Sequence, residues 1–499
     1  MRKTILALAL ILLLTGCNVN HNEQTTPYDE KKGVDTSEPP PATQTNGQSD
    51  DDNKGDYVTD DDELPIGYID FYDYLDGKHQ IVYEKGFQTI NGTTSNAPVL
   101  KEGMVPVFFD DDEYWWGLGI EYWRIAENAE QWYDYSTDVK RWANAMTEDG
   151  SMWVWIPRFA YRIASGLHVD EEIKGTIEIQ FIDMNNKTKI GDIISTQYPE
   201  VSGDAMLDFV VHPAFTADLA NGGWDKDISG LWVSKFQIGE WIDPGEIYSK
   251  PYHLAARELQ IGQAYNEGFD FDRDKESHMI KNSEWGAVVY LSSSAYGTPE
   301  DAIHRNIEEY TGGGGYDFDY IDNVLQTTTG NVYGVYDMTG GGGNLVAAYA
   351  PDPKLSQMIE AVGNMEVGGY TADEIFMTVS KDATHPNQST KYITLYTWAE
   401  DGDNYEANGY NSENQKFGDA IYETSSSGDV MTVQGSSWGG GSSMFPRDRS
   451  IPGFTDSLSA YFVRGGLPYH KSFVGPYSYE VFDAAKEAFF GYHIALVVE

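Results

Sequence analysis

Cysteine is almost absent from this chain, because Cys17 is the only one among 499 residues. One thiol cannot form a disulfide within the chain, and it cannot supply a zinc site built from several cysteines. We therefore expect a fold that uses neither disulfides nor cysteine-based metal binding.

Basic residues are scarce as well. Lys and Arg total 33 against 79 Asp and Glu, which gives a formal net charge of −46. Such a charge repels nucleic acid and anionic lipid surfaces, so nucleic acid is not expected as a partner. The excess suits a soluble extracellular protein. It leaves open whether the acidic groups serve solubility alone or also the binding of cations and cationic partners.

The start of the chain lacks an apolar run long enough for an ordinary membrane span. Arg2 and Lys3 precede the short run ILALALILLL, and LTGC follows at Leu14 to Cys17. This pattern resembles a bacterial lipoprotein signal, in which the peptide is cut before the cysteine and the thiol carries a lipid. We expect residues 1–17 to be this signal and Cys17 to anchor the protein in the bacterial cell membrane, facing the extracytoplasmic side.

Large apolar residues are nearly missing from residues 18–64. This segment holds 13 acidic residues and 3 lysines, with the clusters SDDDN and TDDDE and the run EPPPA. It cannot bury enough surface to offset the entropy of ordering, so we predict a disordered acidic linker. Residues 65–103 suggest one or two short strands before the main domain at 104–499.

Aromatic residues, by contrast, are abundant from Met104 onward. SMWVWIPRFAYRI, at residues 151–163, is typical of a strand buried on both faces. TIEIQFID and LDFVVHPAF predict further strands, and LWVSKFQIGEW predicts one with a single apolar face. Helical spacing predicts two helices, HLAARELQIGQAYNEG (253–268) and a second one capped by Ser277. The prediction is an α+β fold that is rich in loops, with short antiparallel strands and about two helices. The side chains of the one-faced strand are Trp232, Ser234, Phe236 and Ile238.

Several motifs occur in an order that resembles one known family. They are WVWIPRFAYRI, VVHPAF, GLWVSKFQIGE, KNSEWGAVVYL, GVYDMTGGGGNLV, SSWGGG, FVRGG and GYHIALVVE. Together they resemble the formylglycine-generating enzymes (sulfatase-modifying factors), whose fold is a variant of the C-type lectin fold. The resemblance covers roughly residues 104–499.

Four consecutive glycines depart from that family. A phosphate-binding loop is an unsuitable explanation for GNVYGVYDMTGGGGN, because no Lys or Arg lies between Gly330 and Lys354. The family has a W-E-W phrase where this chain has Gly341 to Val346, so we predict a tight turn that admits positive φ. The missing phrase also weakens the calcium site that the resemblance implies, so Asn344 is only a weak calcium candidate.

The catalytic cysteines of the family are also missing. Counting on from the R-G-G phrase, their positions correspond to about His470 and Gly475. The resemblance therefore implies that the copper chemistry is lost, and no catalytic residue is predicted. An enzyme of this type with an altered metal site stays open as an alternative, and so does a structural part of a surface or phage-derived assembly.

The non-enzymatic branch of the family suggests a binding role instead. Its members present side chains in the loop between R-G-G and the last strand, where this chain is rich in Tyr and Phe. Rigid aromatic side chains give contact area at low entropic cost. We expect an extracellular protein or glycan as the ligand, although core packing is an equally good explanation for these side chains. The candidate ligand-binding residues are Tyr469, His470, Phe473, Tyr477 and Tyr479.

A second weak calcium candidate lies in FDFDRDKES. Asp270, Asp272 and Asp274 alternate as at the start of a calcium loop, but the glycine and the distant glutamate of an EF-hand are absent. A solvated acidic loop is the simpler explanation. No cofactor is expected other than, at most, calcium.

Overall fold

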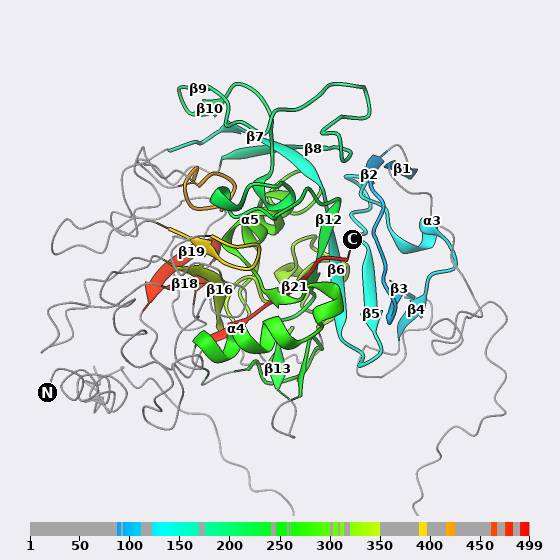
Figure 1. The fold of residues 1–499 in the computed structure, drawn as a ribbon. Coiled ribbons are helices and arrows are strands. Elements are labelled where there is room, and N and C mark those ends of the chain that lie inside the picture. Colours follow the sequence, from blue (N-terminus) through cyan, green and yellow to red (C-terminus); the bar gives the residue numbers. More distant parts are fainter. Residues whose placement is uncertain are drawn as a thin grey trace, which may run out of the picture.

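The computed structural model leaves both expected N-terminal segments, 1–17 and 18–64, outside the described residues (Figure 1). The described residues are 87–90, 93–110, 122–168, 175–240, 246–256, 259, 261–299, 303–307, 310–313, 320–349, 389–396, 416–424, 461–466, 475–482 and 490–498. A short hairpin of β1 (Phe87–Ile90) and β2 (Thr93–Asn96) precedes the main sheet, where one or two strands were predicted.

A seven-stranded antiparallel sheet forms the middle of the domain, in the order β15-β21-β12-β6-β5-β3-β4. All six residues of β6 are buried, which confirms the strand predicted to be covered on both faces. Trp155 of β6 lies opposite Trp232 of β12, with ring centroids 5.2 Å apart. The strands are β3 (Met104–Phe109), β4 (Trp123–Ile125), β5 (Asn144–Thr147), β6 (Met152–Pro157), β12 (Gly230–Ser234), β15 (His278–Met279) and β21 (Ile494–Leu496).

The strand predicted to have one apolar face is shorter than expected and is buried on both. β12 ends at Ser234, and Phe236 and Ile238 lie beyond it, also buried. β12 lies between β6 and β21, which pair with its two edges, while the consecutive residues Leu231, Trp232 and Val233 all pack in the main core, so both of its faces are covered. The last strand of the chain therefore returns to the sheet that contains the first strand of the main domain.

A three-stranded sheet, β11-β7-β8, covers the upper end of the domain in Figure 1. It confirms the strand predicted from TIEIQFID, whereas LDFVVHPAF gives only two strand residues and then the short 3-10 helix η3 (Pro213–Phe215). Proline at the start of η3 has no N–H for a sheet bond, so the strand stops there. The strands are β7 (Phe159–Ser165), β8 (Thr176–Phe181) and β11 (Val210–Val211), and the nearby hairpin is β9 (Val201–Ser202) with β10 (Ala205–Met206).

A five-stranded sheet of mixed direction is built around β16. β16 pairs in parallel with β17 and β20 and antiparallel with β18, which in turn pairs with β19. Its strands are β16 (Gly343–Tyr349), β17 (Thr394–Leu395), β18 (Tyr461–Gly465), β19 (Gly475–Phe482) and β20 (Phe490–Tyr492). A small separate pair joins β13 (Gly239–Glu240) to β14 (Ile247–Tyr248).

Both predicted helices are present but begin later than predicted. α4 (Ile261–Asp270) excludes the segment from His253, because Leu254 and Ala255 form bridges to Tyr310 and Gly239 in extended backbone. α5 (Asn282–Ser292) is not capped by Ser277. The Ser277 hydroxyl donates to the carbonyl of Phe269 instead.

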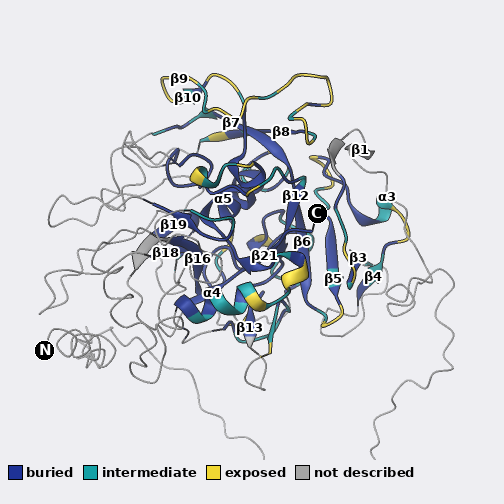
Figure 2. Cartoon of the chain, in the orientation of Figure 1, coloured by how far each residue is buried: buried dark blue, intermediate teal, exposed yellow. Residues whose placement is uncertain are grey.

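The described helices are few, and α5 lies in the core. Every residue of α5 is buried (Figure 2). A methyl group at Gly286 would lie 2.0 Å from the carbonyl oxygen of Gly418, so glycine is what lets the segment 416–424 pack on this helix. With α3 (Ala129–Trp132), the described part of the chain has three α-helices, which establishes an α+β, strand-rich and loop-rich protein. Among the described residues, no helix is both long and apolar enough to cross a bilayer.

Candidate functional site

The candidate binding loop lies between β18 and β19 in the chain. Gly465 and Gly466 at its start have φ of +80° and +73°, so the chain turns sharply there in a conformation that favours glycine. The chain returns at Gly475, the first residue of β19. Three of the predicted ligand-binding residues, Tyr469, His470 and Phe473, fall at 467–474 and lie outside the described residues.

Tyr477 and Tyr479 lie on β19 and not on an exposed loop, which corrects their expected placement. Both side chains are buried, and the Tyr477 hydroxyl donates to Oγ of Ser293 at 2.7 Å. Burial raises the pKa of both phenols, so they stay neutral. They therefore belong to the core, in agreement with the alternative explanation of core packing.

Arg464 is the residue that fixes the base of this loop. It is fully buried, and its guanidinium donates to Oδ1 of Asn282 at 3.0 Å and to the carbonyl of Asp419 at 2.9 Å. Further bonds reach the carbonyls of Ala420 and Ser478 at 3.1 Å. A buried cation is tolerated when its donors are matched in this way. Arg464 thus connects the R-G-G phrase to α5, to β19 and to the segment 416–424.

The first glycines of the run form the predicted turn, and the fourth, Gly343, begins β16. Gly340 and Gly341 have φ of +74° and +68°. A methyl group at Gly340 would come within 2.2 Å of the carbonyl oxygen of Asn306. The N–H of Gly340 donates to the carbonyl of Gly465 at 3.3 Å, which places this turn beside the start of the candidate loop.

Gln237 satisfies the polar groups of the turn. Its Nε2 donates to the carbonyl of Gly342 at 2.7 Å and to Oδ1 of Asn344 at 2.8 Å. Its Oε1 accepts from the N–H of Gly342 at 2.9 Å. Asn344, the weak calcium candidate, also donates to the carbonyl of Asp337 at 3.1 Å. The amide of Asn344 is therefore occupied by internal hydrogen bonds, and a cation would have to displace Gln237.

Asp337 lies directly before this turn and has an unusual environment. Its Oδ1 accepts from the N–H of Gly312 at 2.9 Å and from Nδ2 of Asn306 at 2.8 Å, and its Oδ2 accepts from the N–H of Gln237 at 3.2 Å. Burial raises the pKa of Asp337 to about 6, although these hydrogen bonds favour the ionised form. Because the side chain is fully enclosed, this carboxyl cannot contact a substrate in the folded state.

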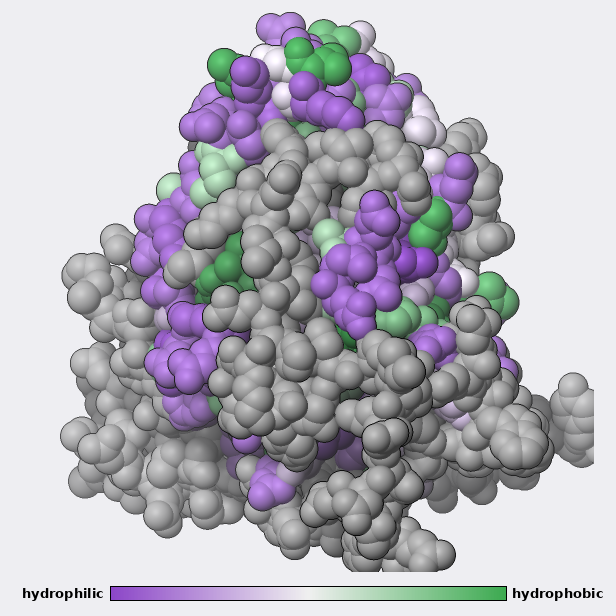
Figure 3. Space-filling view, turned by 90° about the vertical axis from the view of Figure 1, so that its right-hand side faces the viewer, coloured by the Kyte–Doolittle hydropathy of each residue, from purple (hydrophilic) through white to green (hydrophobic). Residues whose placement is uncertain are grey.

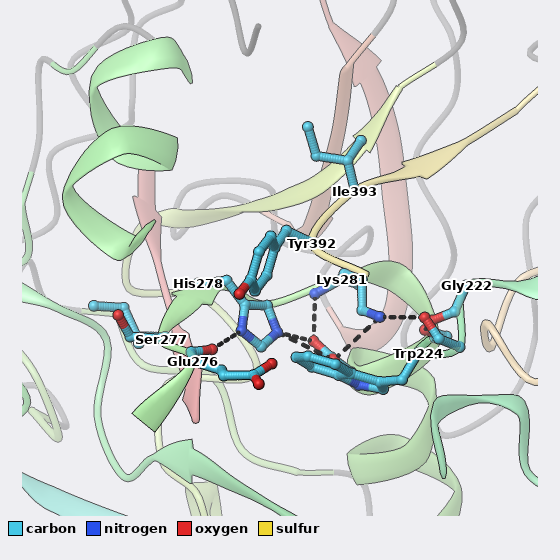
Figure 4. Close-up of polar contacts among 12 residues, drawn as sticks. Gly222, Trp224, Glu276, Ser277, His278, Lys281, Tyr392 and Ile393 are labelled. Atoms are coloured by element: carbon cyan, nitrogen blue, oxygen red, sulfur yellow. Dashed lines mark hydrogen bonds and ion pairs between the residues drawn. The ribbon is translucent and has the colours of Figure 1, made fainter. Parts of the chain in front are cut away.

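A buried cluster of charged side chains lies at the N-terminal end of α5 (Figure 4). Oε2 of Glu284 lies 2.9 Å from Nε2 of His278, and Oε1 lies 3.5 Å from Nζ of Lys281. Nε1 of Trp224 donates to the same carboxylate at 3.2 Å. Burial opposes ionisation, but the charges of His278 and Lys281 outweigh it and lower the pKa of Glu284 to about 2.

The charged cluster at Glu284 joins separate parts of the chain. Nζ of Lys281 donates to the carbonyl of Gly223, and the N–H of Lys281, at the N-cap position, donates to Oε2 of Glu284. The ring of Tyr392 lies 5.6 Å from that of His278 (Figure 4). The cluster therefore holds the 222–224 turn, α5 and the strand region of β17 together.

A second buried carboxyl, Glu423, holds the segment 416–424. It accepts from the hydroxyls of Tyr161 and Tyr290 and from the N–H of Gly418, the last at 2.9 Å. Burial, assisted by the nearby charge of Asp419, raises the pKa of Glu423 to about 7. Such a pKa suits a general acid or base, but the side chain is fully enclosed and hydrogen-bonded within the core.

The acidic stretch proposed as a calcium loop serves as a local cap. Asp272 is the N-cap of the short helix η5 (Arg273–Lys275), and its carboxylate pairs with Nζ of Lys275 at 2.5 Å. Asp270 ends α4, and Asp274 lies within η5. In the part of the chain that the structure describes, no group of three or more His, Cys, Asp or Glu side chains is placed to hold a metal ion.

Sequence reasoning missed Gln237, Arg464 and Glu423 as positioning residues. Two of them lie within phrases of the resemblance, WVSKFQIGE and FVRGG, so their place in the motif was visible although their role was not. Glu423 lies in no such phrase. Comparison of the chain with protein-family models gave no match, and comparison with curated proteins gave no significant relative.

Proposed function

We propose that this protein is a lipid-anchored bacterial surface protein whose C-type-lectin-like domain binds an extracellular protein or glycan without catalysis. The observation that carries the proposal is the Arg464-centred base of the loop at 467–474. The buried guanidinium of Arg464 bonds to β19, to α5 and to the segment 416–424, and so connects the two strands that flank Tyr469, His470 and Phe473 in the chain. Loops on such rigid bases are where binding residues are commonly found.

The strand order supports the lectin-like part of the proposal. β21 pairs with β12 and so lies in the same sheet as β3. Gly340 and Gly341 form a turn with left-handed backbone beside the R-G-G phrase. Both features agree with the fold that the motif order suggested. The buried, internally paired carboxyls Asp337 and Glu423 are consistent with a supporting role and not a catalytic one.

Substitution in the loop tests the binding function. We expect the triple change Tyr469→Ala, His470→Ala and Phe473→Ala to reduce binding on an array of immobilised glycans and extracellular proteins by more than about tenfold, with an unchanged melting temperature. The matched control is Tyr477→Phe, which removes only a buried hydroxyl and should leave binding intact. Array binding that survives the triple change would place the site elsewhere.

The anchor is tested separately in bacterial cells. We expect the full chain to incorporate radiolabelled palmitate and to remain with the membrane fraction, whereas Cys17→Ser should incorporate none, because Cys17 is the only thiol in the chain. Equal labelling of the two proteins would contradict the lipoprotein assignment without affecting the binding test.

A further inference from the structure

Two isoleucines in the segment between β8 and β9 are exposed to solvent. Ile190 is 84% exposed and Ile193 is 76% exposed, which makes them the two most exposed of the large apolar side chains in the described residues. Figure 3 shows hydrophobic side chains among hydrophilic ones at the upper end of the molecule, where the β9–β10 hairpin lies. We name residues 187–193 the apolar tip.

The apolar tip is held rigidly although its isoleucines are exposed. The N–H of Thr188 donates to the carbonyl of Asp192 at 2.8 Å, and the N–H of Gly191 donates back to the carbonyl of Thr188 at 3.0 Å. Gly191 has a φ of +107°, which fixes the sharp turn between the two isoleucines. A rigid tip presents its apolar surface without an ordering cost on binding.

The base of the apolar tip is fastened to the core. Nη2 of the buried Arg158 donates to Oδ1 of Asn186 at 2.5 Å, and the N–H of Ile194 donates to the carbonyl of Asn186 at 2.9 Å. The side chain of Ile194 packs against the buried residues Ile182 and Val211. One isoleucine of this segment therefore points inward, while Ile190 and Ile193 are left outside.

The charges of the apolar tip differ from those of the whole chain. Between Ile182 and Ile194 two lysines, Lys187 and Lys189, balance two aspartates, in a chain whose net charge is −46. A second copy of such an acidic chain would be repelled. A surface that is apolar inside and carries phosphate groups at its edge fits two isoleucines flanked by two ammonium groups.

We propose that the apolar tip inserts Ile190 and Ile193 into the surface of a phospholipid bilayer, with Lys187 and Lys189 beside the lipid phosphates. A projecting tip can enter the boundary between headgroups and acyl chains, where its apolar surface leaves water. This contact does not depend on a lipid at Cys17. It would add a second attachment that holds the domain against the membrane.

The experiment uses residues 18–499, which contain every residue that the structure describes and carry neither the leader nor a lipid. This protein is floated with phosphatidylcholine vesicles, because anionic lipid would repel a chain of this charge. We expect the wild type to float with the vesicles. Ile190→Ser with Ile193→Ser should lower the partition coefficient by at least about tenfold, since each apolar side chain contributes to insertion.

A matched control is available at Ile307, which is 50% exposed and directly follows Asn306, a residue that forms a backbone bridge with Gly340. Ile307→Ser should float like the wild type, and all three proteins should have the same melting temperature. Absence of wild-type flotation, or flotation that the double substitution does not reduce, overturns the proposal. If the wild type does not float, a protein would be the remaining partner for the apolar tip.

Discussion

Replacement of Glu423 by glutamine should stabilise this protein at neutral pH and leave it unchanged in acid. Glu423 has a pKa of about 7 in the folded chain, against an ordinary value of 4.5. Between these two values the folded state binds a proton that the unfolded state has released, so stability falls as pH rises. Glutamine resembles the protonated side chain and has no proton to lose.

The magnitude follows from the two pKa values. A difference of about 2.5 units corresponds to about 3 kcal/mol, at about 1.4 kcal/mol per unit. The free energy of unfolding of the wild type should fall by this amount between about pH 4.5 and pH 7, with no further loss above that range. Glu423→Gln should avoid the loss. Its advantage is reduced by up to about 1 kcal/mol if one of the bonds to Tyr161, Tyr290 or Gly418 is less well made.

The assay is denaturant unfolding of both proteins at several pH values from 4 to 8. The quantity of interest is the difference between the two free energies of unfolding, because acidic groups that do not interact with Glu423 contribute equally to both proteins. We expect this difference to be near zero at pH 4.5 and to grow with pH. A constant difference across the range would refute the reasoning from Glu423.

Two further outcomes concern the buried cluster at α5 and the glycine turn. Glu284→Gln leaves Lys281 and His278 without their anion and should cost about 3–5 kcal/mol of unfolding free energy at pH 7. The wild type should itself lose stability as pH falls from 4.5 towards 2, because protonation of Glu284 removes the same anion. A variant as stable as the wild type in denaturant titrations at pH 7 would contradict this. Gly340→Ala forces a side chain into left-handed backbone and against the carbonyl of Asn306, so the melting temperature should fall, by more than for alanine at the open turn of Gly203.

The strands were easier to predict than their partners. β6 was visible in the sequence because burial on both faces leaves an uninterrupted apolar run, and that run depends only on neighbouring residues. The pairing of Gln237 with the turn at Gly342 joins residues 105 positions apart. No local pattern shows such a bond, so the role of Gln237 required the structure.

Helix starts were misplaced for a related reason. Ser277 is a good N-cap by residue type, but its hydroxyl donates to the carbonyl of Phe269. The next residues, His278 and Met279, form β15 and pair with the main sheet. Lys281 is therefore the N-cap of α5, and its N–H donates to the carboxylate of Glu284. Tertiary pairing decided between two locally acceptable starts. The same applies to Tyr477, whose aromatic ring suits a binding loop and a buried strand equally well.

The position of β21 has a consequence for how this chain is made. β21 lies between β12 and β15, yet it begins at Ile494, long after β12 has ended at Ser234. Until residues 494–496 leave the ribosome, one edge of β12 has no partner within the sheet and can pair with another chain. A product that stops short of Ile494 should therefore aggregate instead of forming a smaller, stable domain.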